Sequence, residues 1–126
     1  MQPLVLVADD EPDVRRFVDY LLRLARFDVV TCADGTTALE AAAERRPDLL
    51  LLDISMPNLD GKQVLREVRE RLGDDAPPAI FLTAHADERR AGLELGAADY
   101  ITKPFSKRNL IARVEAALDG RPAATK

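Results

Sequence analysis

The chain has 126 residues, of which 47% are hydrophobic and 32% charged, so it is long enough for one soluble domain without metal or disulfide support. A net charge of -4, with arginine pairs scattered along the chain, disfavours nucleic-acid binding, which requires clustered lysine and arginine. The single cysteine, Cys32, and the lack of an apolar run of membrane-spanning length predict a cytoplasmic protein that does not enter the membrane.

The first part of the chain predicts two pairs of a strand and a helix. Residues 4–8 form an apolar run typical of a buried strand, and Pro12 suits the first turn of the following helix. The apolar face of that helix is made of Val14, Phe17, Val18, Leu21, Leu22 and Ala25. A second strand is expected at residues 27–32. An alanine-rich helix should then end at Arg46, because the residue before a proline is disfavoured in helical conformation.

The middle of the chain contains four consecutive leucines, residues 49–52, followed by Asp53. An apolar run this short, bounded by Pro47 and Pro57, indicates a strand buried on both faces, and such strands belong to parallel sheets covered by helices. Asp53 should then lie at the carboxyl edge of the sheet, where open parallel sheets bind their ligands. Taken alone, Asp53 fits a turn residue after a strand equally well.

The alternation continues after the central strand. An amphipathic helix is predicted over residues 64–72, and a buried strand at residues 79–82 ends at Thr83. A weaker helical pattern then leads to Gly96, which is typical of a helix C-terminus.

The last part of the chain predicts a short strand at residues 99–102, followed by Lys103 and a final helix. The apolar positions of that helix are Leu110, Ile111, Val114 and Leu118. Periodicity is lost after this helix. We therefore expect a domain over residues 1–119 and a tail or the start of a linker over residues 120–126.

Five strands alternating with five helices predict an α/β fold, a doubly wound parallel sheet with right-handed crossovers and helices on both faces. Five strands suit the flavodoxin-like order 2-1-3-4-5, in which the first and third strands are neighbours. Side chains at the carboxyl ends of the strands then meet in one crevice. They are Asp9, Asp10, Asp53, Thr83 and Lys103. Each has an ordinary explanation as a cap, turn or surface residue, but five at one edge indicate a functional site.

The residue types at this edge suit phosphoryl chemistry. Three carboxylates packed together repel one another, and a hard divalent cation such as Mg²⁺ relieves that repulsion and is commonly shared with phosphate. A carboxylate can itself attack phosphorus, while Lys103 and the Thr83 hydroxyl can hold the added oxygens. The cluster therefore predicts an aspartate that accepts a phosphoryl group with metal assistance.

Four motifs in this chain resemble the receiver domains of bacterial two-component response regulators. They are Val7-Ala8-Asp9-Asp10-Glu11-Pro12, Leu52-Asp53-Ile54-Ser55-Met56-Pro57-Asn58-Leu59-Asp60-Gly61, Leu82-Thr83-Ala84 and Tyr100-Ile101-Thr102-Lys103-Pro104-Phe105. The resemblance covers Leu4 to about Leu118. It implies that Asp53 accepts a phosphoryl group from the phosphohistidine of a histidine kinase or histidine phosphotransfer protein, in a module that only takes up and slowly releases this group.

The resemblance also implies a ligand set for Mg²⁺. Asp10 and Asp53 would bind the ion directly, together with the backbone carbonyl of Ser55. Asp9 would act mostly through a water molecule.

For the output of the signal, the resemblance implies that Thr83 and Lys103 hold the phosphoryl oxygens and that Tyr100 is a switch residue coupled to Thr83. Movement of Tyr100 would change the surface made by the fourth helix, the fifth strand and the fifth helix. That surface would contact a downstream effector domain or protein, or a second copy of the chain. The family also implies a cis peptide bond between Lys103 and Pro104.

Two other classes of protein share parts of this pattern. A Mg²⁺-dependent phosphatase with an aspartate nucleophile would have a second aspartate two positions later, where this chain has Ser55. A flavin- or nucleotide-binding domain would need a glycine- or hydroxyl-rich loop after the first strand, where residues 9–12 are acidic.

Overall fold

A computed structural model of the chain describes residues 2–84 and 96–119. Within them, parallel strands form one five-stranded sheet in the predicted order, β2-β1-β3-β4-β5. The strands are β1 (Leu4–Ala8), β2 (Asp28–Cys32), β3 (Leu49–Asp53), β4 (Ala79–Thr83) and β5 (Asp99–Thr102). The helices are α1 (Pro12–Leu24), α2 (Gly35–Arg45), α3 (Gly61–Leu72) and α5 (Lys107–Asp119), with a 3-10 turn η1 (Gly73–Asp75). The helix expected before Gly96 and the tail at 120–126 lie outside the described residues.

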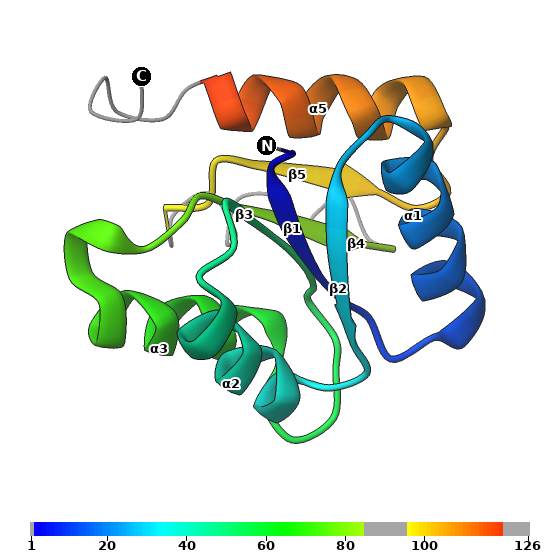
Figure 1. Cartoon of the computed structure of the whole chain (residues 1–126). Coiled ribbons are helices and arrows are strands. Elements are labelled where there is room, and N and C mark those ends of the chain that lie inside the picture. The colour runs from blue at the N-terminus through cyan, green and yellow to red at the C-terminus, as the bar shows by residue number, and fades with distance from the viewer. Residues whose placement is uncertain (1, 85–95, 120–126) are drawn as a thin grey trace.

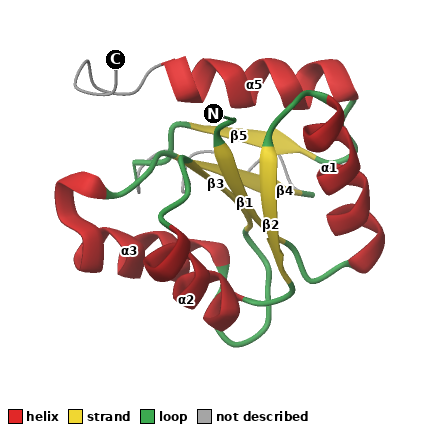
Figure 2. Cartoon of the chain, viewed as in Figure 1, coloured by secondary structure: helices red, strands yellow, loops and turns green. Residues whose placement is uncertain are grey.

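The sheet lies between two layers of helices (Figures 1 and 2), and it separates two apolar cores. Helices α1 and α5 cover one face, and α2 and α3 cover the other. Because successive side chains of a strand point to opposite faces, Leu6 packs in the core under α2 and α3, whereas Val5 and Val7 pack in the core under α1 and α5. Every residue of β3 and β4 is buried, as expected for central parallel strands.

The ends of α2 and α3 follow from their sequences. Asp34 caps α2 by accepting a hydrogen bond from the Thr37 N–H, and Asp60 forms a reciprocal capping box with Gln63 at the start of α3. Arg46, which precedes Pro47, leaves the helix with a positive φ of 47°. The predicted stop of α2 at this residue is therefore confirmed.

One expectation about α1 is wrong. The sequence predicts Phe17 on the apolar face of the helix, but its side chain is 48% exposed, whereas Val18, Leu21 and Leu22 of the same face are buried. Phe17 lies at the margin of that face and stacks on Phe105, with ring centroids 6.1 Å apart. With two further exposed side chains it forms an apolar stripe on α1, which consists of Phe17, Tyr20 and Leu24.

Cys32 ends β2, which is an edge strand of the sheet. Its thiol is free and buried in the core under α2 and α3. Burial raises the pKa of this thiol from 9.0 to about 11, the charge of Asp34 adds to the increase, and Arg15 opposes it. Among the described residues, no helix has both the length and the apolar character required to cross a membrane.

Candidate functional site

The carboxyl edge of the sheet brings the predicted residues together. Asp9 follows β1, Asp53 ends β3, Thr83 ends β4 and Lys103 follows β5. The strand register aligns these ends, with Asp53 opposite Leu82 in β4. Asp53, Thr83 and Lys103 border a cavity of about 360 Å³, which is lined by Asp10, Glu11, Asp53, Ile54, Ser55, Thr83, Ala84 and Lys103.

A larger depression, of about 700 Å³, lies away from this edge, between α3, the start of β5 and the end of α5. Its charged lining residues in the described part of the chain are Arg69 and Asp99. Arg69 donates a hydrogen bond to the Gly96 carbonyl, and Asp99 forms an ion pair with Arg113. The depression therefore lacks a cluster of reactive groups, and the smaller cavity is the candidate site.

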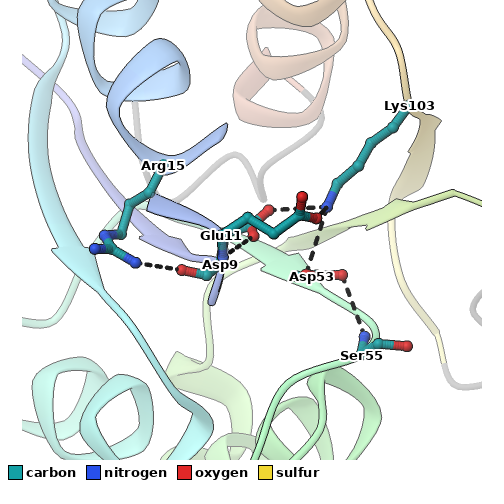
Figure 3. A network of polar contacts seen from close by, with 6 residues as sticks. All are labelled: Asp9, Glu11, Arg15, Asp53, Ser55 and Lys103. Carbon is teal, nitrogen blue, oxygen red and sulfur yellow. Dashed lines mark hydrogen bonds and ion pairs between the residues drawn. The ribbon is translucent and has the colours of Figure 1, made fainter. Parts of the chain in front are cut away.

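Lys103 is the central cation of the site (Figure 3). Its Nζ lies 3.0 Å from Asp9 Oδ2, 3.3 Å from Glu11 Oε1 and 3.4 Å from Asp53 Oδ2. Burial by itself lowers the pKa of Lys103, but its close contact with the Asp9 carboxylate and the charges of Asp53 and Asp9 outweigh that effect and raise the pKa. The lysine therefore stays charged. The peptide bond between Lys103 and Pro104 is cis, which confirms the expectation from the sequence.

Asp9 is fully buried and fixed by its neighbours. Its Oδ1 accepts a hydrogen bond from the Glu11 N–H at 2.9 Å, and its backbone carbonyl accepts one from Arg15 at 2.8 Å (Figure 3). Its Oδ2 is buried and accepts no well-directed hydrogen bond from the described residues, although Lys103 lies beside it. A buried carboxylate oxygen in this state is suited to bind a further cation or a water molecule.

Asp53 is buried at a position that disfavours its charge. Burial raises the pKa of its carboxyl group from 3.8 to about 7, and the charges of Asp9 and Asp10 add to this. Lys103 and the hydrogen bond from the Ser55 N–H, which is 3.2 Å from Asp53 Oδ1, oppose the increase. Asp53 therefore titrates near neutral pH when only protein groups surround it.

The acidic residues fit a hard divalent cation. Asp9, Asp10, Glu11 and Asp53 each present a carboxylate oxygen, and these atoms all lie within 4.8 Å of one another. Oxygen donors at such spacing are what Mg²⁺ prefers. The buried Oδ2 of Asp9, which lacks a hydrogen bond, supports the same conclusion.

Thr83 and Tyr100 lie on neighbouring strands, but only Thr83 reaches the cavity. Thr83 is buried and lines the cavity. Tyr100 does not line it; it is half-buried in β5, opposite Phe81 of β4, and packs against the core under α2 and α3. The two residues are on neighbouring strands, because Thr83 pairs with Thr102 in the same ladder.

Residues 5–115 match the response regulator receiver domain family. The chain belongs to this family. Among curated relatives of this receiver domain, the transcriptional regulatory protein PrrA of Mycobacterium tuberculosis is 47% identical over 121 residues, which are 94% of this chain and 51% of that protein. PrrA of Mycobacterium leprae is also 47% identical, over 123 residues that cover 96% of this chain and 52% of the relative. The receiver domain thus spans about half the length of the curated relatives it matches.

Solved structures agree with this assignment. The receiver domain of a Francisella response regulator is 33% identical and has a TM-score of 0.85, with 94% of this chain and 98% of that chain covered. The chemotaxis response regulator CheY4 of Vibrio cholerae is 28% identical, with a TM-score of 0.86 and coverage of 93% and 99%. The flavodoxin-like fold is therefore shared with known receiver domains.

Three residues of this receiver domain make contacts at or near the site that the sequence did not predict. Glu11 contacts Lys103, and its signal was only its place in the acidic run after β1. Gly61 and Gly35 hold the loop after Asp53: a Cβ on Gly61 would collide with the Asp53 carbonyl, and one on Gly35 would collide with the Leu59 carbonyl. At both positions the sequence shows only a glycine and gives no sign of the carbonyl group that its backbone approaches.

Proposed function

We propose that this receiver domain accepts a phosphoryl group on Asp53 from the phosphohistidine of a histidine kinase or histidine phosphotransfer protein. The observation that carries the proposal is the placement of Asp53 in one cavity with Lys103, Thr83 and a carboxylate cluster. The domain would extend over residues 1–119 and act as a signalling module in the cytoplasm, where its free cysteine stays reduced.

The residues divide the chemistry between them. Asp53 Oδ forms the new bond to phosphorus, and the bond from phosphorus to the donor nitrogen breaks. The electron pair of that bond stays on the nitrogen, and the histidine, which carries a proton on its other ring nitrogen, leaves as a neutral imidazole. Lys103, which lies 3.4 Å from Asp53 Oδ2, moves toward the added phosphoryl oxygens, and the Thr83 hydroxyl donates to one of them. Asp9 retains Lys103 near the site during this exchange.

Mg²⁺ is the proposed cofactor. Asp10, Asp53 and the Ser55 carbonyl would bind it directly, and Asp9 would bind it mostly through water. A bound Mg²⁺ would offset the repulsion among the carboxylates and reduce the negative charge that opposes attack on a phosphoryl group. Because the pKa of Asp53 is about 7 without metal, a cation here would also favour its reactive, ionised form.

We propose two partner surfaces, one on α1 for the phosphodonor and one that includes β5 and α5 for the output. The apolar stripe of α1 (Phe17, Tyr20 and Leu24) begins next to the Lys103 segment, since Phe17 stacks on Phe105. This surface suits a protein phosphodonor better than a small molecule. The output surface would include β5 and α5, together with the fourth helix, which is outside the described residues. Its partner would be an effector domain or protein or a second copy of the chain.

The switch is proposed to pass from Thr83 to Tyr100. Phosphorylation would draw the Thr83 hydroxyl toward Asp53. The side chain of Tyr100, on the neighbouring strand, would then move into the space that this hydroxyl leaves. The size of this shift is limited by how differently the two packings bind the phosphoryl group and the metal.

Acetyl phosphate with Mg²⁺ tests the proposed function. We expect intact-mass spectrometry to show one added phosphoryl group, stable in acid and labile in base. The Asp53→Asn variant should gain none, and excess EDTA should prevent labelling of the parent. Full labelling of Asp53→Asn, or of the parent in EDTA, would refute the assignment. Many turnovers on small phosphomonoesters would instead indicate the phosphatase alternative, which lacks its second aspartate here because Ser55 occupies that position.

A further inference from the structure

Lys103 has one more carboxylate neighbour than the proposed chemistry uses. Asp9 positions the lysine and Asp53 is the acceptor, but Glu11 also lies 3.3 Å from its Nζ. The side chain of Lys103 is only 15% exposed, whereas that of Glu11 is 61% exposed. The third carboxylate therefore approaches the lysine from the solvent side of the cavity.

The backbone fixes Glu11 in this place. Glu11 is the N-cap residue of α1, and its N–H donates to Asp9 Oδ1 at 2.9 Å. Its side chain forms no capping hydrogen bond with the helix that it precedes. Instead it crosses toward Lys103 and lines the cavity that contains Asp53 (Figure 3). Glu11 therefore places an exposed negative charge at the edge of the cavity that contains Asp53.

We propose that Glu11 determines which phosphodonors the domain accepts, by disfavouring small, highly charged ones. The inference rests on the proposed phosphorylation of Asp53 and adds a specificity residue to it. Glu11 acts in two ways: its contact holds Lys103 away from an incoming phosphoryl group, and its charge repels anionic donors at the cavity entrance. A protein donor offsets this cost through contacts elsewhere on the surface, which a small molecule cannot make.

Two small donors of different charge test the inference. Acetyl phosphate is close to a dianion near neutral pH, whereas phosphoramidate carries less negative charge. Labelling rates at saturating Mg²⁺ should rise about three- to tenfold in Glu11→Gln with acetyl phosphate and less with phosphoramidate. The gain with acetyl phosphate should shrink in 0.5 M salt, because Glu11 is exposed and its charge is screened. A purely structural role for Glu11 would produce neither dependence.

Two further variants separate the causes. Glu11→Asp keeps the charge but shortens the side chain, so its acetyl phosphate rate should lie between those of the parent and Glu11→Gln if the contact with Lys103 contributes. Asp13→Asn removes one exposed acidic charge from the first turn of the same helix, outside the cavity lining, and should stay within about twofold of the parent.

The outcomes distinguish this inference from the proposed function. If the parent is labelled but Glu11→Gln reacts at the parent rate or more slowly with both donors, the role of Glu11 is wrong and the function of Asp53 stands. An equal gain with both donors that persists in high salt would also overturn it. If the parent is not labelled at Asp53 by either donor, the proposed function fails and this inference fails with it.

Discussion

Asp53 combines the position of a nucleophile with surroundings that oppose its charge. Burial and the nearby carboxylates of Asp9 and Asp10 bring its pKa to about 7, and Lys103 offsets only part of that effect. The ionised form of such a carboxylate is costly in free energy, and a bound cation would offset that cost. This cost should lower the free energy of unfolding of the domain by a measurable amount.

We expect this cost to appear as pH-dependent stability in EDTA. Because the pKa of Asp53 is about 7 when folded and 3.8 as its ordinary value, the stability linked to protonation is fully present below about pH 4 and is lost as pH rises to 7. Above pH 7 the loss amounts to a few kcal/mol. Urea unfolding of the parent and of Asp53→Asn measures the difference, which should grow in favour of the variant as pH rises. A difference between parent and variant that does not change with pH would contradict the raised pKa of Asp53.

Millimolar Mg²⁺ should stabilise the parent in the same measurement, because it would bind only the folded state.

Substitution of Gly61 tests whether the loop after Asp53 tolerates a side chain at its close backbone contact. Its N–H donates to the Ile54 carbonyl at 3.0 Å, and the methyl group of Gly61→Ala would collide with the Asp53 carbonyl. We expect a loss of about 1–3 kcal/mol in urea unfolding and slower labelling by acetyl phosphate. Gly73→Ala is the control: it has open space but a positive φ of 55°, so it should lose stability without slower labelling. Equal labelling rates in both variants would argue against a role for this contact.

The strands and their order could be predicted because short apolar runs between breakers carry a strong signal in buried parallel strands. The convergence of Asp53 and Lys103 followed from that order alone. The position of Phe17 could not be predicted in the same way. It lies at the margin of an apolar face, and its stacking on Phe105 depends on the packing of α1 against a segment far away in the chain. The contact of Glu11 with Lys103 joins segments 92 residues apart and is equally invisible in the sequence.

At the level of elements, β5 should report activation. Tyr100 packs against the core beneath α2 and α3, and Asp99 beside it is paired with Arg113 of α5. Beryllofluoride with Mg²⁺, which mimics a phosphoryl group, is expected to shift the backbone amide NMR signals of Tyr100 and of α5 as well as those around Asp53. Mg²⁺ alone is the matched control. Changes restricted to the immediate neighbours of Asp53 would place the output surface elsewhere.

The whole molecule supports the site through one sheet rather than through any single element. The residues of the site come from the ends of four strands, and two separate cores hold that sheet from opposite faces. Loss of packing on either face should therefore move the residues of the candidate site relative to each other. Substitutions that are confined to one core should add independently to those in the other, because few side chains reach both.

The rate at which the buried thiol of Cys32 reacts should report how often the folded protein opens. It is the chain's single cysteine, it ends the edge strand β2 and packs in the core under α2 and α3, and its pKa of about 11 leaves little thiolate near pH 8. A thiol reagent that absorbs light on reaction should thus modify the native protein slowly, at a pace set by local or global opening. Mg²⁺ should slow the reaction further, while urea-unfolded chain should react at once. Rapid, complete modification of native protein, unaffected by Mg²⁺, would show that β2 leaves its thiol accessible.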